Sequence, residues 1–124
     1  MKFARWTFTA AGVWGLLVLT PMLFLEAHVS AAYPPAITHP EHYYGFVGVA
    51  LAWQVAFLIL ARDPARYRPL MIPAVLEKLA YALCTIALFA VGRTSGAVLA
   101  TGLLDLVLAA LFVVAFLRTR PAAP

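Results

Sequence analysis

Two adjacent charged residues, Glu77 and Lys78, lie inside an apolar segment that runs from residue 68 to residue 91. A segment of this length can cross a bilayer as a helix. An ionisable side chain in the middle of such a helix costs roughly 2.5–3.5 kcal/mol on insertion scales, so it is usually paired, hydrated or functional. A carboxylate in this position could carry a proton, bind a ligand or act as a general acid or base.

Helical geometry gathers the other polar residues of this segment beside the two charges. At about 100° per residue, Tyr81, Cys84 and Thr85 share with Glu77 and Lys78 a sector about 120° wide. Large aliphatic residues occupy the opposite side of the helix. The pattern predicts a helix with one face in lipid and the other facing a protein interior or a wet cavity.

Two polar residues of other apolar segments, Gln54 and Asp105, are the expected partners of these charges. A rise of about 1.5 Å per residue places Glu77 and Lys78 roughly 10–12 Å into their helix, with Gln54 at a similar depth. Asp105 lies roughly 18 Å from the same side, and an extended lysine could span much of the difference. We therefore expect Gln54, Glu77, Lys78 and Asp105, with Tyr81 beside them, to form one intramembrane polar cluster.

The sequence leaves two interpretations of this cluster open. In the structural one, a Lys78–Asp105 ion pair, with Glu77 and Gln54 hydrogen-bonded, fixes which helices are neighbours. Lys78 could instead extend to the membrane headgroups without any partner. In the functional one, the half-buried carboxylates form a proton-titratable or ligand-binding site.

A second group of candidate site residues lies in the loop after the first apolar segment. It comprises Glu26, His28, His39, Glu41 and His42. Imidazole and carboxylate side chains can bind zinc or copper. No second motif of defined spacing accompanies them, and Pro40 with Glu41 is also typical of a helix start. The sequence therefore predicts no metal site, and the group remains a candidate site in the outer loop.

Four apolar segments of about 20 residues position these groups. They cover approximately residues 5–25, 43–61, 70–91 and 96–117. The chain has 124 residues, of which 65% are hydrophobic and only 11% charged, far from the composition of a soluble domain. The predicted fold is all-α, a single transmembrane domain over residues 1–124 that forms an integral membrane four-helix bundle.

The distribution of Lys and Arg residues predicts the direction in which the chain crosses the membrane. Apart from Lys78, which lies inside an apolar segment, seven of them are expected on one side of the membrane: Lys2, Arg5, Arg62, Arg66, Arg68, Arg118 and Arg120. Only Arg93 is expected on the other side. Positive charge is concentrated on the cytoplasmic side of membrane proteins. We therefore predict a multi-pass protein of the bacterial cytoplasmic (inner) membrane with both termini in the cytoplasm. The net charge of +4 belongs to this pattern and does not indicate nucleic-acid binding.

The first apolar segment has a competing interpretation as a cleaved signal peptide, with residues 29–31 as the cleavage site. Its length of about 20 residues exceeds that of a signal-peptide core, and Glu26 and His28 precede the site. We therefore expect the segment to be retained. Recovery of a chain that begins at Ala32 on N-terminal sequencing would contradict this expectation.

Small residues predict which helix faces pack closely, because they let helix backbones approach. Gly12 and Gly15 mark such a face in the first segment, and Gly102, beside Asp105, marks one in the fourth. In the second segment, Gly48, Ala52 and Ala56 form a stripe that points almost opposite to Gln54. The sequence does not decide which of those two faces lies inward.

The layout consists of a basic start, a first outer loop with prolines, a basic loop at residues 62–68, a tight turn at 92–95 and a basic end. It resembles the small four-helix bacterial membrane proteins grouped as DoxX-like. The segments YYGFVGVALAWQ and LMIPAVLEK are typical of a distinct branch of that group. The resemblance implies a four-helix membrane fold and, for some members, an association with quinone-linked oxidoreductase subunits. It identifies no functional residue.

These observations favour an accessory or small-amphiphile-binding membrane protein rather than an enzyme. The alternatives are a proton-coupled transporter, oligomeric because four helices enclose little volume, and an enzyme that performs acid–base chemistry on a lipid or quinone. Both alternatives would use Glu77 or Asp105. The sequence contains no nucleophile–base pattern that would support an enzyme, and no nucleotide motif that would indicate a cofactor. The expected partners are membrane lipid and a second copy or another membrane subunit.

Overall fold

The computed structural model describes residues 1–124, and its regular structure is entirely helical. The four long helices are α1 (Lys2–Met22), α3 (Pro40–Arg62), α4 (Met71–Ala90) and α5 (Gly96–Arg118). A short 3₁₀ turn, Arg68–Leu70, leads into α4. All four are long and apolar enough to cross a membrane. In length and composition the chain is that of a multi-pass membrane protein, as predicted.

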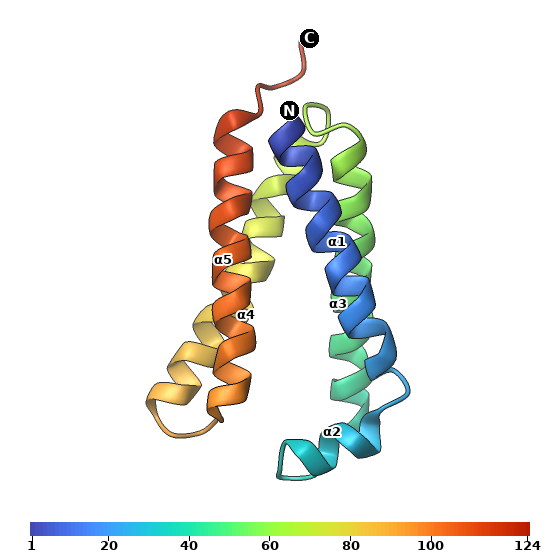
Figure 1. The fold of residues 1–124 in the computed structure, drawn as a ribbon, viewed down its shortest axis with the longest axis vertical. Helices are drawn as coiled ribbons and strands as arrows, with labels where there is room; N and C mark the ends of the chain where they lie inside the picture. The colour runs from blue at the N-terminus through green and yellow to red at the C-terminus, as the bar shows by residue number, and fades with distance from the viewer.

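The long helices form two pairs, α1 with α3 and α4 with α5 (Figure 1). The two pairs converge at the end that holds both termini and the loop between α3 and α4, and they diverge towards the opposite end (Figure 1). Helix α1 also packs against α5, whereas α3 and α4 have little contact with each other. The molecule is therefore joined at one end and open at the other.

An aromatic cluster joins the two pairs where they converge. The ring centroid of Phe8 on α1 lies 4.3 Å from that of Phe112 on α5 and 5.9 Å from that of Phe57 on α3. Phe57 and Phe112 are 5.0 Å apart, edge to face. Small residues such as Ala4, and Met71 at the start of α4, complete this buried core. Large rings surrounded by small residues let three helices meet closely at this end.

Arg68 fastens the loop between α3 and α4 to the end of α5. Its Nε atom donates hydrogen bonds to the carbonyl oxygens of Phe116, at 3.3 Å, and Thr119, at 2.7 Å. Its guanidinium carbon lies 3.7 Å from the centroid of the Phe116 ring. Carbonyl groups at the end of a helix lack partners within the helix and carry partial negative charge, so this contact stabilises the terminus.

Glycines make the close contacts within each pair. A Cβ atom on Gly15 of α1 would overlap the side-chain amide of Gln54 on α3. A Cβ atom on Gly102 of α5 would overlap the hydroxyl of Thr85 on α4. The predicted close-packing faces of α1 and α5 are therefore confirmed. On α3, Gln54 faces inward, whereas nothing lies within 4 Å of a Cβ atom built on Gly48, so the small-residue stripe lies on the outer surface.

The loop after α1 contains a short helix, α2 (Glu26–Ala32), that the sequence pattern did not predict. Two tyrosines at the start of α3 hold this region in place. The Tyr43 hydroxyl donates to the carbonyl of Met22 at 2.6 Å, and the Tyr44 hydroxyl donates to Glu26 Oε2 at 2.8 Å. Helix α2 thus lies at the end where the two pairs diverge (Figure 1).

Candidate functional site

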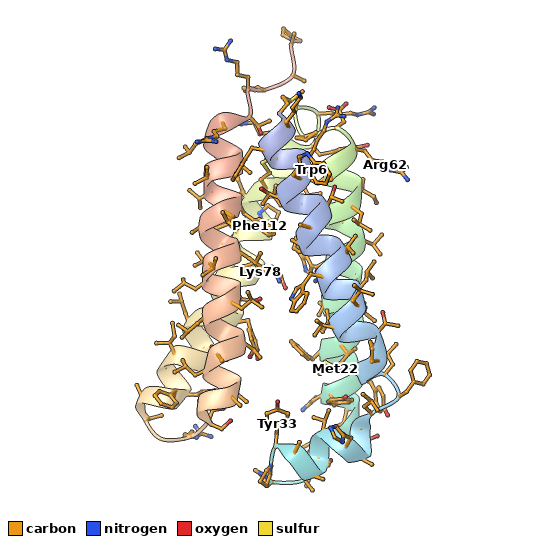
Figure 2. All side chains as sticks on the ribbon, in the orientation of Figure 1. Trp6, Met22, Tyr33, Arg62, Lys78 and Phe112 are labelled. Atoms are coloured by element: carbon orange, nitrogen blue, oxygen red, sulfur yellow. The ribbon has the colours of Figure 1, made fainter.

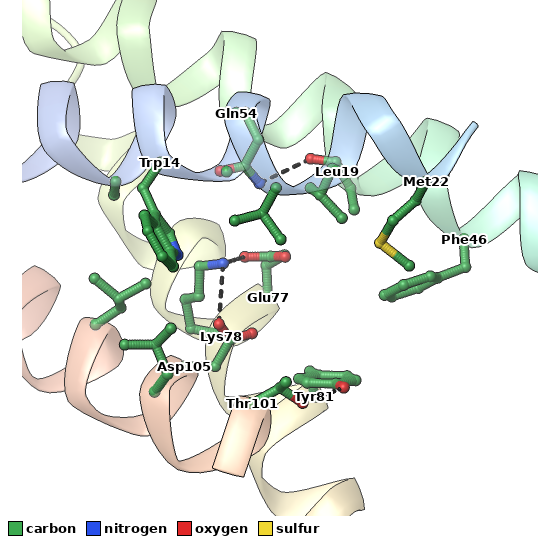
Figure 3. A pocket seen from close by; sticks show the side chains of 16 residues that line it. Trp14, Leu19, Met22, Phe46, Gln54, Glu77, Lys78, Tyr81, Thr101 and Asp105 are labelled. Atoms are coloured by element: carbon green, nitrogen blue, oxygen red, sulfur yellow. Dashed lines mark hydrogen bonds and ion pairs between the residues drawn. The ribbon is translucent and has the colours of Figure 1, made fainter. Parts of the chain in front are cut away.

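A cavity of about 250 Å³ lies between the four long helices (Figure 3). Its residues Lys78 and Met22 lie on the α2 side of Phe112, which belongs to the aromatic core (Figure 2). Sixteen residues line it, of which ten are hydrophobic. All five residues of the predicted polar cluster lie in its wall, namely Gln54, Glu77, Lys78, Tyr81 and Asp105. Residues from α3, α4 and α5 that are far apart in the sequence are therefore brought to one place in the interior.

Lys78 lies at the centre of the charged part of the wall. Its Nζ atom is 3.5 Å from Glu77 Oε2 and 3.5 Å from Asp105 Oδ1 (Figure 3). The side chain is buried, and Nζ also lies 5.5 Å from the centroid of the Phe57 ring. The expected Lys78–Asp105 pair is present and connects α4 to α5. Lys78 therefore points into the bundle (Figure 2) and does not extend to the headgroups.

The two carboxylates are not equally satisfied. Asp105 Oδ1 accepts a hydrogen bond from Lys78. Glu77 Oε2 is buried and accepts none, although it is close enough to Lys78 to form an ion pair. With one ammonium and two carboxylates, the group carries a formal charge of minus one. Buried oxygens of this kind normally have a hydrogen-bond partner, so the cavity offers an acceptor to an incoming group.

Gln54 lies in the same wall but is not hydrogen-bonded to the charged groups. Its Nε2 atom donates to the carbonyl of Ala50, one turn earlier in α3, at 2.8 Å. The structural interpretation has Gln54 hydrogen-bonded, and it is, but to its own helix and not to the charged groups. Gln54 packs against Gly15, and this contact holds its amide close to its own helix.

A hydroxyl pair connects α4 and α5 further along the cavity, on the α2 side of the charges. The Tyr81 hydroxyl and Thr101 Oγ1 are 2.7 Å apart (Figure 3). Thr101 Oγ1 also lies 2.6 Å from the carbonyl of Val98 and can donate to it, in which case Tyr81 donates to Thr101. The arrangement fixes the Tyr81 ring at the cavity wall.

The inward face of α4 differs from the sector of Glu77, Lys78, Tyr81, Cys84 and Thr85 that the helical count predicted. Its buried residues include Ala74, Lys78, Ala82 and Thr85, so Lys78 marks the middle of the face and Glu77 its edge. Cys84 is exposed, which corrects its expected place in the interior. The cause is the packing partner, because α5 covers the Lys78 side of α4 whereas α3 stands away from the Glu77 side.

An open groove between α3 and α4 adjoins the cavity. Four residues line both hollows, namely Phe46, Ala50, Glu77 and Tyr81. The Phe46 and Tyr81 rings stack across the gap between the two helices with centroids 6.0 Å apart. Trp53 and Cys84 also line the groove. The cavity therefore adjoins the apolar groove on the outer surface, and the four shared residues form the boundary between the two hollows.

Sequence reasoning did not identify two aromatic residues of the cavity wall. Trp14 of α1 faces the charged cluster, and Phe46 of α3 lies towards the opposite side (Figure 3). Trp14 is nevertheless 53% exposed, and in the sequence it is one apolar residue among many, so no signal singled it out.

The structure divides the candidate group in the outer loop. Ligand atoms of His39, Glu41 and His42 lie within 4.8 Å of one another, and all three residues are exposed. Glu26 instead accepts the hydrogen bond from Tyr44, and His28 lies outside the group. Helix α3 begins at Pro40 with Glu41 in its first turn, as predicted. The positive end of the helix dipole at this place disfavours a cation.

None of the protein-family models, curated proteins or solved structures compared with the chain matches it. The DoxX-like affiliation therefore stays a prediction from layout. The function is inferred from the cavity and its chemistry.

Proposed function

We propose that the protein binds a small amphiphile in the cavity between its four long helices. The observation that carries the proposal is the composition of the wall, in which charged groups lie among a majority of hydrophobic residues. Ligand sites in proteins combine an apolar lining with a few placed polar groups that orient the ligand. A molecule with an apolar tail and one polar head matches this division.

The boundary that the cavity shares with the open groove supports a ligand that is soluble in the membrane. Four wall residues are shared, so a ligand could pass from the outer surface between α3 and α4 to the charged cluster. A transmembrane helix surface faces hydrocarbon, into which the tails of membrane amphiphiles extend. The proposed role is that of an accessory protein that holds such a molecule, in keeping with the expected DoxX-like affiliation.

The proposed location is the bacterial cytoplasmic membrane, with both termini in the cytoplasm. It is supported by the seven basic residues at one end of the molecule and the single Arg93 at the other. In this orientation the cavity lies towards the outer side of the aromatic core.

Native mass spectrometry of protein released from membranes in a mild detergent tests the proposal. Val18 and Val13 on α1 have similar exposed fractions, 44% and 45%, but only Val18 lines the cavity. We expect a small molecule to remain bound to the wild type and to Val13→Phe, and to be lost from Val18→Phe, whose larger ring fills the cavity. Absence of a bound molecule, or equal retention in both variants, would contradict the proposal.

A further inference from the structure

We infer that the amphiphile carries a protonated amine, with its head inside the cavity at Glu77 and its tail extending into the groove between α3 and α4. This inference rests on the proposed function and specifies the ligand class of the same site. It follows from the charge of the cavity, the position of Glu77 and the aromatic rings beside it.

The charged groups of the cavity wall do not balance one another. The cavity wall contains two carboxylates, Glu77 and Asp105, and one ammonium, Lys78, with a formal charge of minus one. In an environment of low polarity, an unbalanced charge attracts an opposite charge strongly. A cationic head would balance the group, an anionic head would add to the imbalance, and a neutral hydroxyl would leave it unchanged.

Hydrogen bonding distinguishes the two carboxylates. Asp105 has a hydrogen bond from Lys78, whereas the buried Oε2 of Glu77 has no donor. Glu77 also keeps 20% of its side chain exposed. A protonated amine supplies hydrogen-bond donors and positive charge together, and bonds between charged partners are stronger than neutral ones. Glu77 is therefore the carboxylate that receives the head.

The position of Glu77 fixes the direction of the tail. Glu77 lines both the cavity and the groove, and of the charged residues in the cavity wall it alone does so. An amine at Glu77 can therefore extend its alkyl chain along Trp53 and Leu76 in the groove, where eight of ten lining residues are hydrophobic. The tail would lie at the boundary with the lipid.

Aromatic rings beside Glu77 favour the same class of head. Phe46 and Tyr81 border the junction of cavity and groove, and Trp14 borders the cavity. The faces of aromatic rings attract cations, most strongly where water is excluded. The wall thus combines an unbalanced carboxylate with aromatic surfaces, which suits an ammonium group better than a hydroxyl or a carboxylate.

Three probes with the same tail and different heads test the inference: dodecylamine, dodecanol and dodecanoate, each with a terminal bromine atom. Bromine quenches tryptophan fluorescence at short range, and Trp53 lines the groove. The protein carries Trp6→Phe and Trp14→Phe, so that Trp53 is the only reporter, and is held in phosphatidylcholine nanodiscs. Quenching is measured against probe concentration at neutral pH.

We expect saturable quenching, with a higher affinity for the amine than for the alcohol or the carboxylate. Glu77→Gln removes the charge while keeping the shape of the side chain, and it should weaken amine binding by roughly tenfold or more with little effect on the alcohol. Glu77→Asp keeps the charge and should keep the preference for the amine, which also checks that changes at this position are tolerated. Equal binding of the three heads, or an unchanged amine affinity in Glu77→Gln, would overturn the inference.

The variant Val18→Phe, with Val13→Phe as its control, separates this inference from the proposed function. If Val18→Phe weakens all three probes equally and the heads show no ranking, the cavity binds amphiphiles and only the amine assignment is wrong. If Val18→Phe and Val13→Phe bind every probe as the reporter protein does, the cavity is not the binding site and both proposals fail.

Discussion

Lys78 is the only cation in the cavity wall, and it lies within 3.5 Å of carboxylates on two helices. Its neighbours Glu77 and Asp105 are both partly buried. Removing Lys78 would leave two like charges near each other without compensation. Removing the charge of Glu77 would leave a neutral pair. The three residues therefore have different expected effects on folding.

We expect Lys78→Met to destabilise the protein by about 3–5 kcal/mol, the usual effect of removing one member of a buried ion pair. Glu77→Gln should have a much smaller effect, because Lys78 and Asp105 remain paired. Reversible unfolding in mixed micelles, followed by circular dichroism, measures both. Equal losses in the two variants would show that Glu77 is needed to hold the helices together.

For individual residues, the sequence was a better guide to which side chains lie close together than to the hydrogen bonds that they form. Helical spacing and depth placed Gln54, Glu77, Lys78 and Asp105 in one region, and all four line the cavity. The hydrogen bond of Gln54 to Ala50 could not be predicted, because it depends on the close contact with Gly15 of another helix.

Helices α4 and α5 depend on one small residue for their approach. The hydroxyl of Thr85 occupies the space where a Cβ atom on Gly102 would lie, and it also donates to the carbonyls of Tyr81 and Ala82 at 3.1 and 3.0 Å. A β-branched side chain with these bonds cannot easily move aside. The helices would have to separate to admit a methyl group.

We therefore expect Gly102→Ala to destabilise the protein by about 1–3 kcal/mol, as overpacking does. Gly48→Ala is the matched control, because Gly48 also lies within a helix but has open space around it. It should be neutral or stabilising by up to about 1 kcal/mol, since alanine favours helix formation. Thermal unfolding in detergent compares the two, and a loss of the same size in both variants would contradict the packing argument.

Element positions could be predicted wherever a long apolar pattern existed. The four long helices follow from such patterns, whereas the seven residues of α2 are too few to show one. The sequence did not decide the orientation of α3, because either the small-residue stripe or the face with Gln54 could lie inward. In the structure the face with Gln54 packs against α1. The face of α4 was centred incorrectly because the sequence does not reveal that α3 stands away from it.

The whole molecule has its termini and the loop between α3 and α4 at one end, and α2 with the turn between α4 and α5 at the other (Figure 1). The predicted orientation places the first end in the cytoplasm. Cysteine labelling in intact cells tests it, because Cys84 is the only native cysteine and can be removed by Cys84→Ser.

We expect a membrane-impermeant maleimide to label the variant Thr94→Cys in intact cells, since Thr94 lies in the turn between α4 and α5. The variant Ala123→Cys, near the C-terminus, should be labelled only after the membrane is opened. The opposite pattern would reverse the proposed orientation. Labelling of both variants in intact cells would indicate that the chain inserts in two directions.

The pairing of the helices has a consequence for biosynthesis. Each pair is continuous in the sequence, so α1 and α3 can associate in the membrane before the ribosome has made α5. The aromatic core needs Phe112, and Lys78 needs Asp105 as its carboxylate partner on another helix. Both Phe112 and Asp105 lie in α5, the last helix. The bundle can therefore close only when translation is almost complete, and until then Glu77 and Lys78 have only each other as charged partners in the cluster.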